Sequence, residues 1–91
     1  MTVWLHPDAE AELGDAAVYY AAHASTAIAT AFLAEFERLK DVIAENPHRG
    51  AEAAHGFRMF HFDRFPYTAI YAVEDRLGVV IYAVVNRAVL H

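Results

Sequence analysis

The sequence predicts a single α+β domain, residues 1–91, in which a hairpin of two helices packs on a small, mainly antiparallel sheet in the order β-α-α-β-β-β. Three observations favour this class. Two consecutive segments in the first half repeat apolar residues with a helical period. Three apolar, aromatic-rich runs in the second half are separated by short connectors, as in antiparallel strands. A β-prone segment precedes the first helical pattern.

The first two elements meet at a proline. Residues 2–5 (TVWL) are β-prone, and we expect them to join the sheet as an edge strand. Pro7 suits the first position of a helix, because its fixed φ is helical and its missing N–H is not needed there. Acidic residues in the following turns favour the positive end of the helix dipole. One face of this helix carries mostly small apolar residues, namely Ala9, Leu13, Ala16, Ala17 and Tyr20. Such a face predicts close packing against a second helix.

The second helix has a larger apolar stripe. Ser25 or Thr26 can cap its first turn, and Asn46-Pro47 ends it, because a residue before proline avoids helical backbone angles. The stripe consists of Ile28, Phe32, Phe36, Leu39 and Ile43. The charged residues are expected mainly off this stripe: Glu35, Glu37, Arg38, Lys40 and Asp41. The two helices are therefore predicted to form an antiparallel hairpin.

The second half is predicted to be a loop followed by three strands. Residues 49–56 (RGAEAAHG) have no clear period and are interpreted as a mobile loop. The strands are expected at residues 57–62, 67–73 and 79–85, joined by the short connectors 63–66 and 74–78. Strands that are apolar on both faces predict helices on one side and a covered or partner-binding surface on the other.

Charge and composition limit the function. The net charge is −5, from 7 Lys and Arg against 12 Asp and Glu, which argues against broad attraction to nucleic acid. The acidic residues are concentrated in the first half, so a positive face remains compatible with the second half, where five arginines lie. A hydrophobic content of 57% in so short a chain predicts exposed apolar surface that a partner covers.

Cofactors and membranes are not expected. The chain has no cysteine, so it has neither a disulfide nor a thiolate zinc site. No apolar run approaches the length of a membrane span, and the start does not resemble a signal peptide, so we expect a cytoplasmic protein. The histidines show no paired ligand spacing, and no metal is expected: His6, His23, His48, His55, His61 and His91.

Four motifs follow one another along the chain: HPDAEAEL at 6–13, the pair Tyr19-Tyr20, ENPHRG at 45–50, and FRMFHFDRFPYTAIY at 57–71. With them the chain resembles the RelE/ParE toxins of type II toxin–antitoxin systems over about residues 3–87. The resemblance implies a RelE/ParE-like fold and growth arrest. It also implies a cognate antitoxin, ParD-like or RelB-like, bound in a hetero-oligomer.

Within this family the ParE-like branch is favoured, because the long helical hairpin and the HPDAEAEL opening resemble it better. The branch implies inhibition of DNA gyrase by binding rather than by catalysis. Residues expected to bind the target are Arg58, Arg64, Tyr67 and Arg87. A structural interpretation stays open for each: solvated arginines at strand ends and turns, and a tyrosine that only packs.

The RelE-like branch, a metal-independent endoribonuclease acting on mRNA in the ribosome, is the alternative. Such cleavage needs a base, an acid and cations at the phosphate, for which the candidates are Arg58, His61, Tyr71 and Arg87. Members commonly end in a cluster of His, Arg, Pro and Tyr-Trp, whereas residues 86–91 read NRAVLH. This difference also leaves a third hypothesis, a non-toxic relic that only binds an antitoxin.

The antitoxin contact is expected on apolar surface, through a segment that folds on binding as a helix in a groove or as an added strand. Its candidates are Leu13, Tyr20, Phe36, Phe60 and Phe62.

Overall fold

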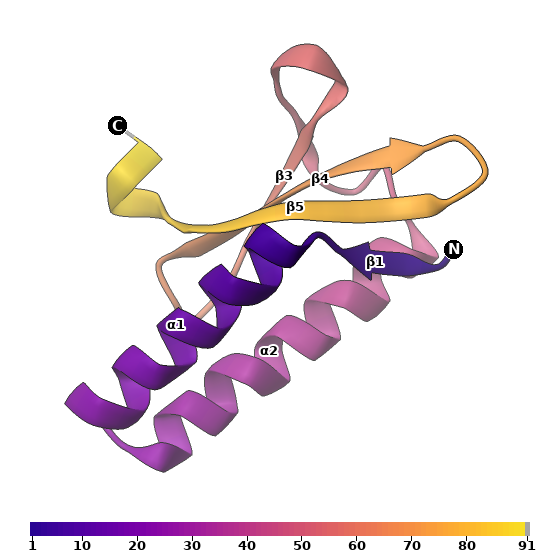
Figure 1. The fold of residues 1–91 in the computed structure, drawn as a ribbon. Helices are drawn as coiled ribbons and strands as arrows, with labels where there is room; N and C mark the ends of the chain where they lie inside the picture. Colours follow the sequence, from indigo (N-terminus) through magenta and orange to yellow (C-terminus); the bar gives the residue numbers. More distant parts are fainter. Residues whose placement is uncertain (91) are drawn as a thin grey trace.

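The computed structural model describes residues 1–90 and has two helices on a five-stranded sheet of order β1-β5-β4-β3-β2 (Figure 1). The strand β1 runs parallel to β5, and the other neighbours are antiparallel. This confirms the predicted α+β class and the edge position of the first strand. The elements are β1 (Val3–Leu5), α1 (Pro7–His23), α2 (Thr26–Glu45), β2 (Ala51–Glu52), β3 (Arg58–His61), β4 (Tyr67–Glu74) and β5 (Gly78–Asn86), with 3-10 turns at Ala54–Gly56 and Arg87–Leu90.

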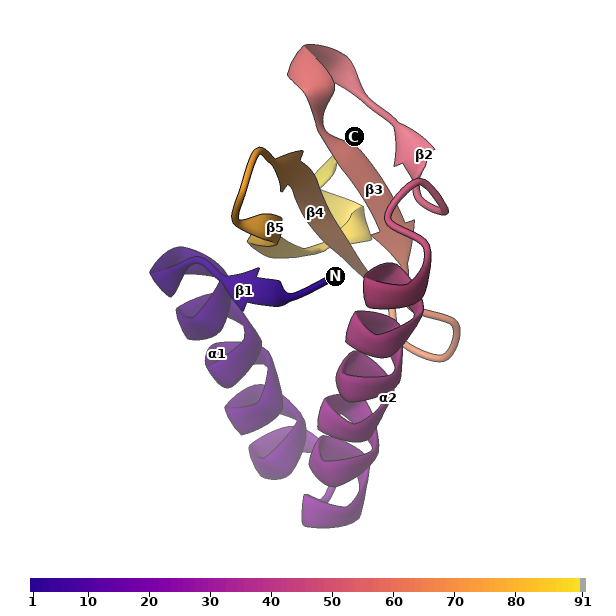
Figure 2. The ribbon, with the colours of Figure 1, turned by 90° about the vertical axis from the view of Figure 1, so that its right-hand side faces the viewer.

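Both helices begin where the sequence predicts. Pro7 is the first residue of α1, and the His6 imidazole Nδ1 accepts a hydrogen bond from the Asp8 N–H at 3.0 Å. The Ser25 hydroxyl caps α2 by accepting from the Ile28 N–H at 3.1 Å. The two helices form the predicted antiparallel hairpin and cover one face of the sheet, as Figure 2 shows. The other face carries the half-exposed indole of Trp4.

The core lies between the hairpin and the sheet, and Phe32 of α2 is at its centre. The Phe32 ring is fully buried and stacks on Phe62 with 5.2 Å between ring centroids. Edge-on or tilted contacts join it to Tyr20, Phe65 and Tyr67 at 5.2 to 5.4 Å. Such aromatic pairs add to the hydrophobic stabilisation that burial provides. This cluster joins both helices to the start of β4, at one end of the sheet.

Two segments differ from the prediction. Residues 49–56 are not only a loop: β2 pairs with β3 through Ala51 opposite Met59 and Glu52 opposite Arg58. A strand of two residues has too little pattern to be recognised, and pairing with β3 forms it. The C-terminal 3-10 turn was also not predicted. It begins at Arg87, whose N–H donates to the Pro66 carbonyl at 2.7 Å.

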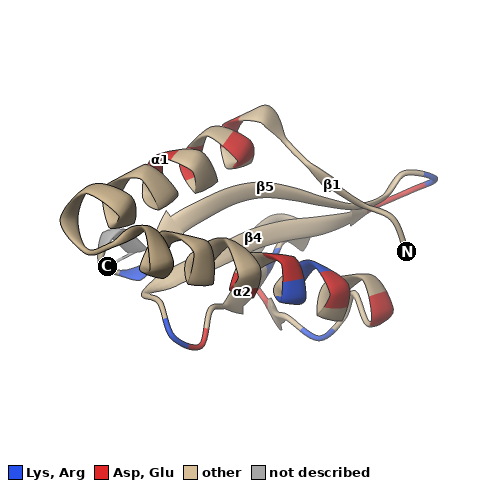
Figure 3. Ribbon diagram, turned by 90° about the horizontal axis from the view of Figure 1, so that it is seen from below, with Lys and Arg blue, Asp and Glu red and all other residues tan. Residues whose placement is uncertain are grey.

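Charge is distributed unevenly over these elements. In Figure 3 the acidic segments lie mostly on the two helices, whereas most basic segments lie in loops and near strand ends. This agrees with the predicted separation of acidic and basic residues. Among residues 1–90, no helix has both the length and the apolar character that crossing a membrane would require.

Candidate functional site

Three of the four residues predicted to bind a target lie at one end of the sheet. Arg64 is in the turn between β3 and β4, Tyr67 is the first residue of β4, and Arg87 directly follows β5. The bond from the Arg87 N–H to Pro66 holds the turn beside the C-terminal 3-10 turn. The side chain of Arg64 is 61% exposed, Arg87 is exposed, and Tyr67 is half-buried. We call Arg64, Tyr67 and Arg87 the cationic end of the sheet.

Arg58, the fourth predicted residue, lies elsewhere and is engaged in the fold. Its guanidinium donates to the carbonyl oxygens of His48 at 3.1 Å and Gly50 at 2.8 Å, and it pairs with the Glu52 carboxylate at 3.2 Å. Only 18% of the side chain is exposed. These bonds tie the segment before β2 to β3. Any contact of Arg58 with a target would therefore compete with bonds that hold this edge of the sheet.

Tyr71 is also engaged in the fold. It is fully buried, its hydroxyl donates to the Pro47 carbonyl at 2.7 Å, and the hydroxyl oxygen accepts from the Gly50 N–H at 2.9 Å. Gly50 approaches so closely that a Cβ there would lie 2.5 Å from the Tyr71 hydroxyl oxygen. The hydroxyl thus fixes residues 47–50 against the core, and its only proton is already donated.

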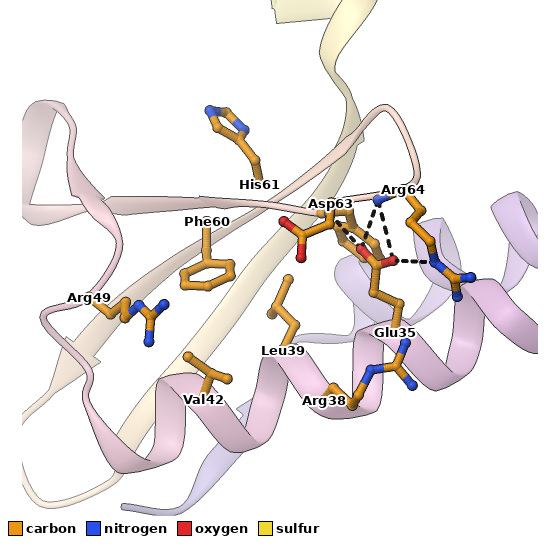
Figure 4. Close-up of a pocket in the computed structure, with 10 residues that line it drawn as sticks. Glu35, Arg38, Leu39, Val42, Arg49, Phe60, His61, Asp63 and Arg64 are labelled. Carbon is orange, nitrogen blue, oxygen red and sulfur yellow. Dashed lines mark hydrogen bonds and ion pairs between the residues drawn. The ribbon is translucent and has the colours of Figure 1, made fainter.

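His61 points away from these groups. Its ring lies on the exposed face of β3, where Nδ1 is 2.6 Å from the Thr68 hydroxyl. Figure 4 shows the His61 ring directed away from α2 and the Phe60 ring directed toward it. The alternation of side chains along a strand explains this difference. His61 is accessible, but it lies on the opposite face from Phe60.

The four nuclease candidates therefore do not form one site. Arg58 pairs with Tyr71 in the ladder between β3 and β4, and His61 lies on the other face of β3. Arg87 lies past the end of β5, beyond the residue paired with Tyr67. Tyr67 and Tyr71 are four residues apart on β4, about 13 Å along a strand. Arg58 and Arg87 are thus at different ends of the sheet.

The residues predicted to contact the antitoxin lie in or against the core. Phe36 and Phe62 are 1% and 3% exposed. Leu13, Tyr20 and Phe60 are partly buried and pack against the core. Phe60 and Phe62 also line a pocket, so a partner that enters it can reach them. Leu13 and Tyr20 keep some exposed surface, whereas Phe36 does not.

This pocket has a volume of about 370 Å³ and lies between the second half of α2 and the outer side of β3 (Figure 4). Its apolar lining comes from two residues of α2 and two at the end of β3: Leu39, Val42, Phe60 and Phe62. Its polar lining consists of Glu35, Arg38, Arg49, Asp63 and Arg64, and His61 completes it. Half of the six arginines of an acidic chain are therefore at one pocket.

Glu35 organises one end of the pocket. The carboxylate accepts from the Asp63 N–H at 2.6 Å and from the Arg64 N–H at 3.4 Å, and it pairs with the Arg64 Nε at 3.4 Å. Glu35 is only 8% exposed, so the prediction that it lies off the apolar stripe is wrong. Its spacing contained the signal, because it follows Phe32 by three residues and precedes Leu39 by four.

Arg38 and Arg49 were not recognised as site residues from the sequence. Both are exposed and line the pocket, Arg38 from α2 and Arg49 from the segment after it. Within residues 1–90 neither has an ion-pair partner. A positively charged residue on a helix next to acidic neighbours gives no sign that it faces a strand edge. Only the packing of α2 beside β3 places both cations in the lining of one pocket.

Two tyrosines have perturbed titration. The Tyr82 hydroxyl donates to the Glu74 carboxylate at 2.8 Å, and this bond, helped by burial and by the negative charge of Glu74, raises the pKa of Tyr82. Burial raises the pKa of Tyr20, with smaller effects of Tyr67 and Tyr19.

In the described part of the chain, no three His, Asp or Glu side chains gather as metal ligands would. His91 lies outside the described residues.

Comparison with known proteins identifies the family. Residues 3–90 match the family model described as the ParE toxin of the type II toxin–antitoxin system parDE. No curated protein matches the chain. The fold is similar to a solved structure described as the chromosomal ParDE toxin–antitoxin system from P. aeruginosa, with a TM-score of 0.83 and 17% identity over 94% of this chain and 95% of the other. The chain therefore belongs to the ParE toxin family of type II toxin–antitoxin systems.

Proposed function

We propose that this protein is a toxin that arrests growth in the cytoplasm by binding and inhibiting DNA gyrase, and that a cognate antitoxin neutralises it. Membership in the ParE toxin family supports the toxin role. The choice of binding over catalysis is supported by one observation above all: Arg58, His61, Tyr71 and Arg87 do not converge. General acid–base cleavage of RNA needs its acid, its base and its cations around one phosphate.

The cationic end of the sheet is the proposed contact with the target. Arg87 is exposed, Arg64 is 61% exposed although its Nε pairs with Glu35, and Tyr67 is half-buried. Arginine and tyrosine are frequent anchors of protein interfaces, because each combines a flat contact surface with hydrogen bonding. A contact with a protein does not require the overall positive charge that binding to nucleic acid requires, so a net charge of −5 is compatible with it.

Exposed apolar surface supports an antitoxin partner. Among the described side chains, the large exposed apolar ones are Met1, Trp4, Val18, Tyr19, Ile28, Leu33, Val73 and Leu77. Four of them lie on the two helices (Val18, Tyr19, Ile28 and Leu33), where a partner can cover them. We infer a hetero-oligomer with the antitoxin, and we expect the toxin to be more soluble in it than alone.

Induction of this chain alone in bacteria tests the proposal. Incorporation of thymidine and of methionine is followed over the first minutes, and supercoiling by purified gyrase is measured with the purified protein. We expect DNA synthesis to fall first and supercoiling to be inhibited. Arg87→Glu should relieve both effects, whereas the matched charge reversal Arg76→Glu, in the turn between β4 and β5, should not.

Other outcomes would select the alternatives. If protein synthesis falls first and mRNA is cut in ribosomes, the RelE-like endoribonuclease replaces the gyrase inhibitor. If the folded protein accumulates and neither rate changes, the binding-only relic is the better description. Equal effects of Arg87→Glu and Arg76→Glu would exclude the cationic end of the sheet as the target contact while leaving the target itself open.

A further inference from the structure

The outer edge of β3 is only partly covered. On its inner side β3 pairs with β4 over its whole length, and the Phe62 N–H continues this ladder to the Tyr67 carbonyl at 2.9 Å. On its outer side β2 pairs only with Arg58 and Met59. Backbone groups alternate in direction along an antiparallel strand, so the N–H and C=O of His61 point to the outer side. In the described part of the chain no strand pairs with His61 there.

The folded chain fixes both ends of this gap. At one end Gly50 turns inward, because its N–H bonds to the buried Tyr71 hydroxyl, and β2 cannot continue past this point. At the other end the Glu35 carboxylate takes the N–H groups of Asp63 and Arg64. The gap between them exposes the backbone of one residue, His61. A strand edge of this kind can accept a short extended segment.

The pocket under this gap indicates which side chains such a segment would carry. Leu39, Val42 and Phe60 offer an apolar lining to a large apolar side chain. Arg38 and Arg49 offer two cations that are in no ion pair within residues 1–90, whereas Glu35 already accepts from two backbone amides and pairs with a third arginine. The Asp63 carboxylate also lines the pocket and is in no ion pair within residues 1–90, so these groups together offer a ligand one net positive charge.

We propose that an acidic, extended segment of the antitoxin binds here, adds a strand to the outer edge of β3 at His61, and places an apolar side chain in the pocket with its carboxylates near Arg38 and Arg49. This inference rests on the proposed neutralisation by an antitoxin, and it adds the place and the chemistry of one contact. The charge is complementary, and an extended segment satisfies the backbone of His61, which a helix in the pocket would not do.

A peptide suits this surface better than a nucleic acid. The pocket lining next to the cations is aliphatic and aromatic, and the gap presents one backbone donor and one backbone acceptor in the geometry of a strand partner. A net charge of −5 also opposes the approach of a polyanion, whereas a short acidic segment needs only two local cations. Binding of RNA is therefore the competing outcome in the test.

The test uses the toxin and its cognate antitoxin. Amide hydrogen exchange of His61 is measured in the isolated toxin and in the purified complex. Affinity for the antitoxin is measured for the wild type, for Arg49→Glu and for the matched charge reversal Arg76→Glu. We expect slower exchange at His61 in the complex. We also expect affinity about three- to tenfold weaker for Arg49→Glu only, since attraction to a carboxylate becomes repulsion.

Each other outcome overturns the inference in a recognisable way. If the complex forms but His61 exchanges as before, or if Arg49→Glu and Arg76→Glu bind alike, the segment binds elsewhere and the proposed function stands. If the antitoxin neither binds the wild type nor relieves its growth arrest, the antitoxin part of the proposed function fails as well. If a short single-stranded RNA binds the toxin and Arg49→Glu abolishes only that binding, the pocket is a nucleic-acid site.

Discussion

At both outer regions of the sheet, a short edge strand covers only part of the neighbouring strand. On one side the short strand β1 leaves the second half of β5 uncovered, and the Glu12 carboxylate of α1 accepts from the Val84 N–H at 3.0 Å. On the other side the short strand β2 leaves the end of β3 uncovered, and the Glu35 carboxylate of α2 accepts from the Asp63 N–H at 2.6 Å. In both places a helix supplies the acceptor that a longer edge strand would have supplied.

The pockets beside these edges differ in charge. Each has a volume of about 370 Å³. The lining of the pocket beside β5 has two acidic residues and no Lys or Arg, whereas the lining of the pocket beside β3 has three arginines against Glu35 and Asp63. Backbone hydrogen bonding therefore does not distinguish the two edges. The charges around them decide which partner segment can approach each one, because like charges facing each other at an interface are unfavourable.

The largest predicted effect concerns Tyr71 of β4, whose hydroxyl bonds to Gly50 just before β2. Tyr71→Phe removes the acceptor of the Gly50 N–H and the donor to Pro47, and it should lower the free energy of unfolding by about 2–3 kcal/mol. At about 4–8 °C per kcal/mol this lowers Tm by roughly 10–20 °C. The control is Tyr82→Phe on β5, because within residues 1–90 the Tyr82 hydroxyl bonds only to the Glu74 side chain. Equal melting temperatures for the two variants would show that the Tyr71 hydroxyl does not fix this edge.

A smaller effect compares the two glutamates directly. Glu35→Ala should cost about 2 kcal/mol, because Glu35 is buried and serves two backbone amides, whereas Glu12→Ala should cost about 1 kcal/mol for one amide. Denaturant midpoints with unchanged slopes measure both. Glu37→Ala is the control, since Glu37 is 66% exposed and pairs only with Lys40. A larger loss of unfolding free energy for Glu12→Ala than for Glu35→Ala would contradict this expectation.

The smallest effect is a dependence on pH near β5. The bond to Glu74 raises the pKa of Tyr82 in the folded state, and burial raises that of Tyr20, so folding favours both neutral phenols. Their contribution is fully present below the unfolded pKa of about 10 and is lost as the pH rises through the folded pKa. Melting temperatures measured from about pH 9 to 11 should fall less steeply for Tyr82→Phe than for the wild type. Identical slopes would contradict the role of the Glu74 bond.

The cationic end of the sheet and the pocket beside β3 differ in how well the sequence predicts them. The cationic end of the sheet could be predicted in outline, because Arg64 lies in a short turn and Tyr67 directly follows that turn, so the two are close in the sequence. The pocket beside β3 could not. Arg38 and Arg49 come from either side of the end of α2, and they line one pocket with Phe60 only because α2 packs beside β3. No local pattern in the sequence reports that packing.

The sequence by itself determined the helices, their caps and the order of the strands. Periodicity, a capping serine at Ser25 and a proline at Pro7 act within a few residues, so the sequence shows them directly. Only the tertiary structure decided what the two edge glutamates do. Glu35 and Asp63 are 28 residues apart, and Glu12 and Val84 are 72 residues apart. The end of β1 follows from the neighbouring Pro7, whereas the end of β2 depends on the buried Tyr71 hydroxyl, which lies 21 residues from Gly50 in the sequence.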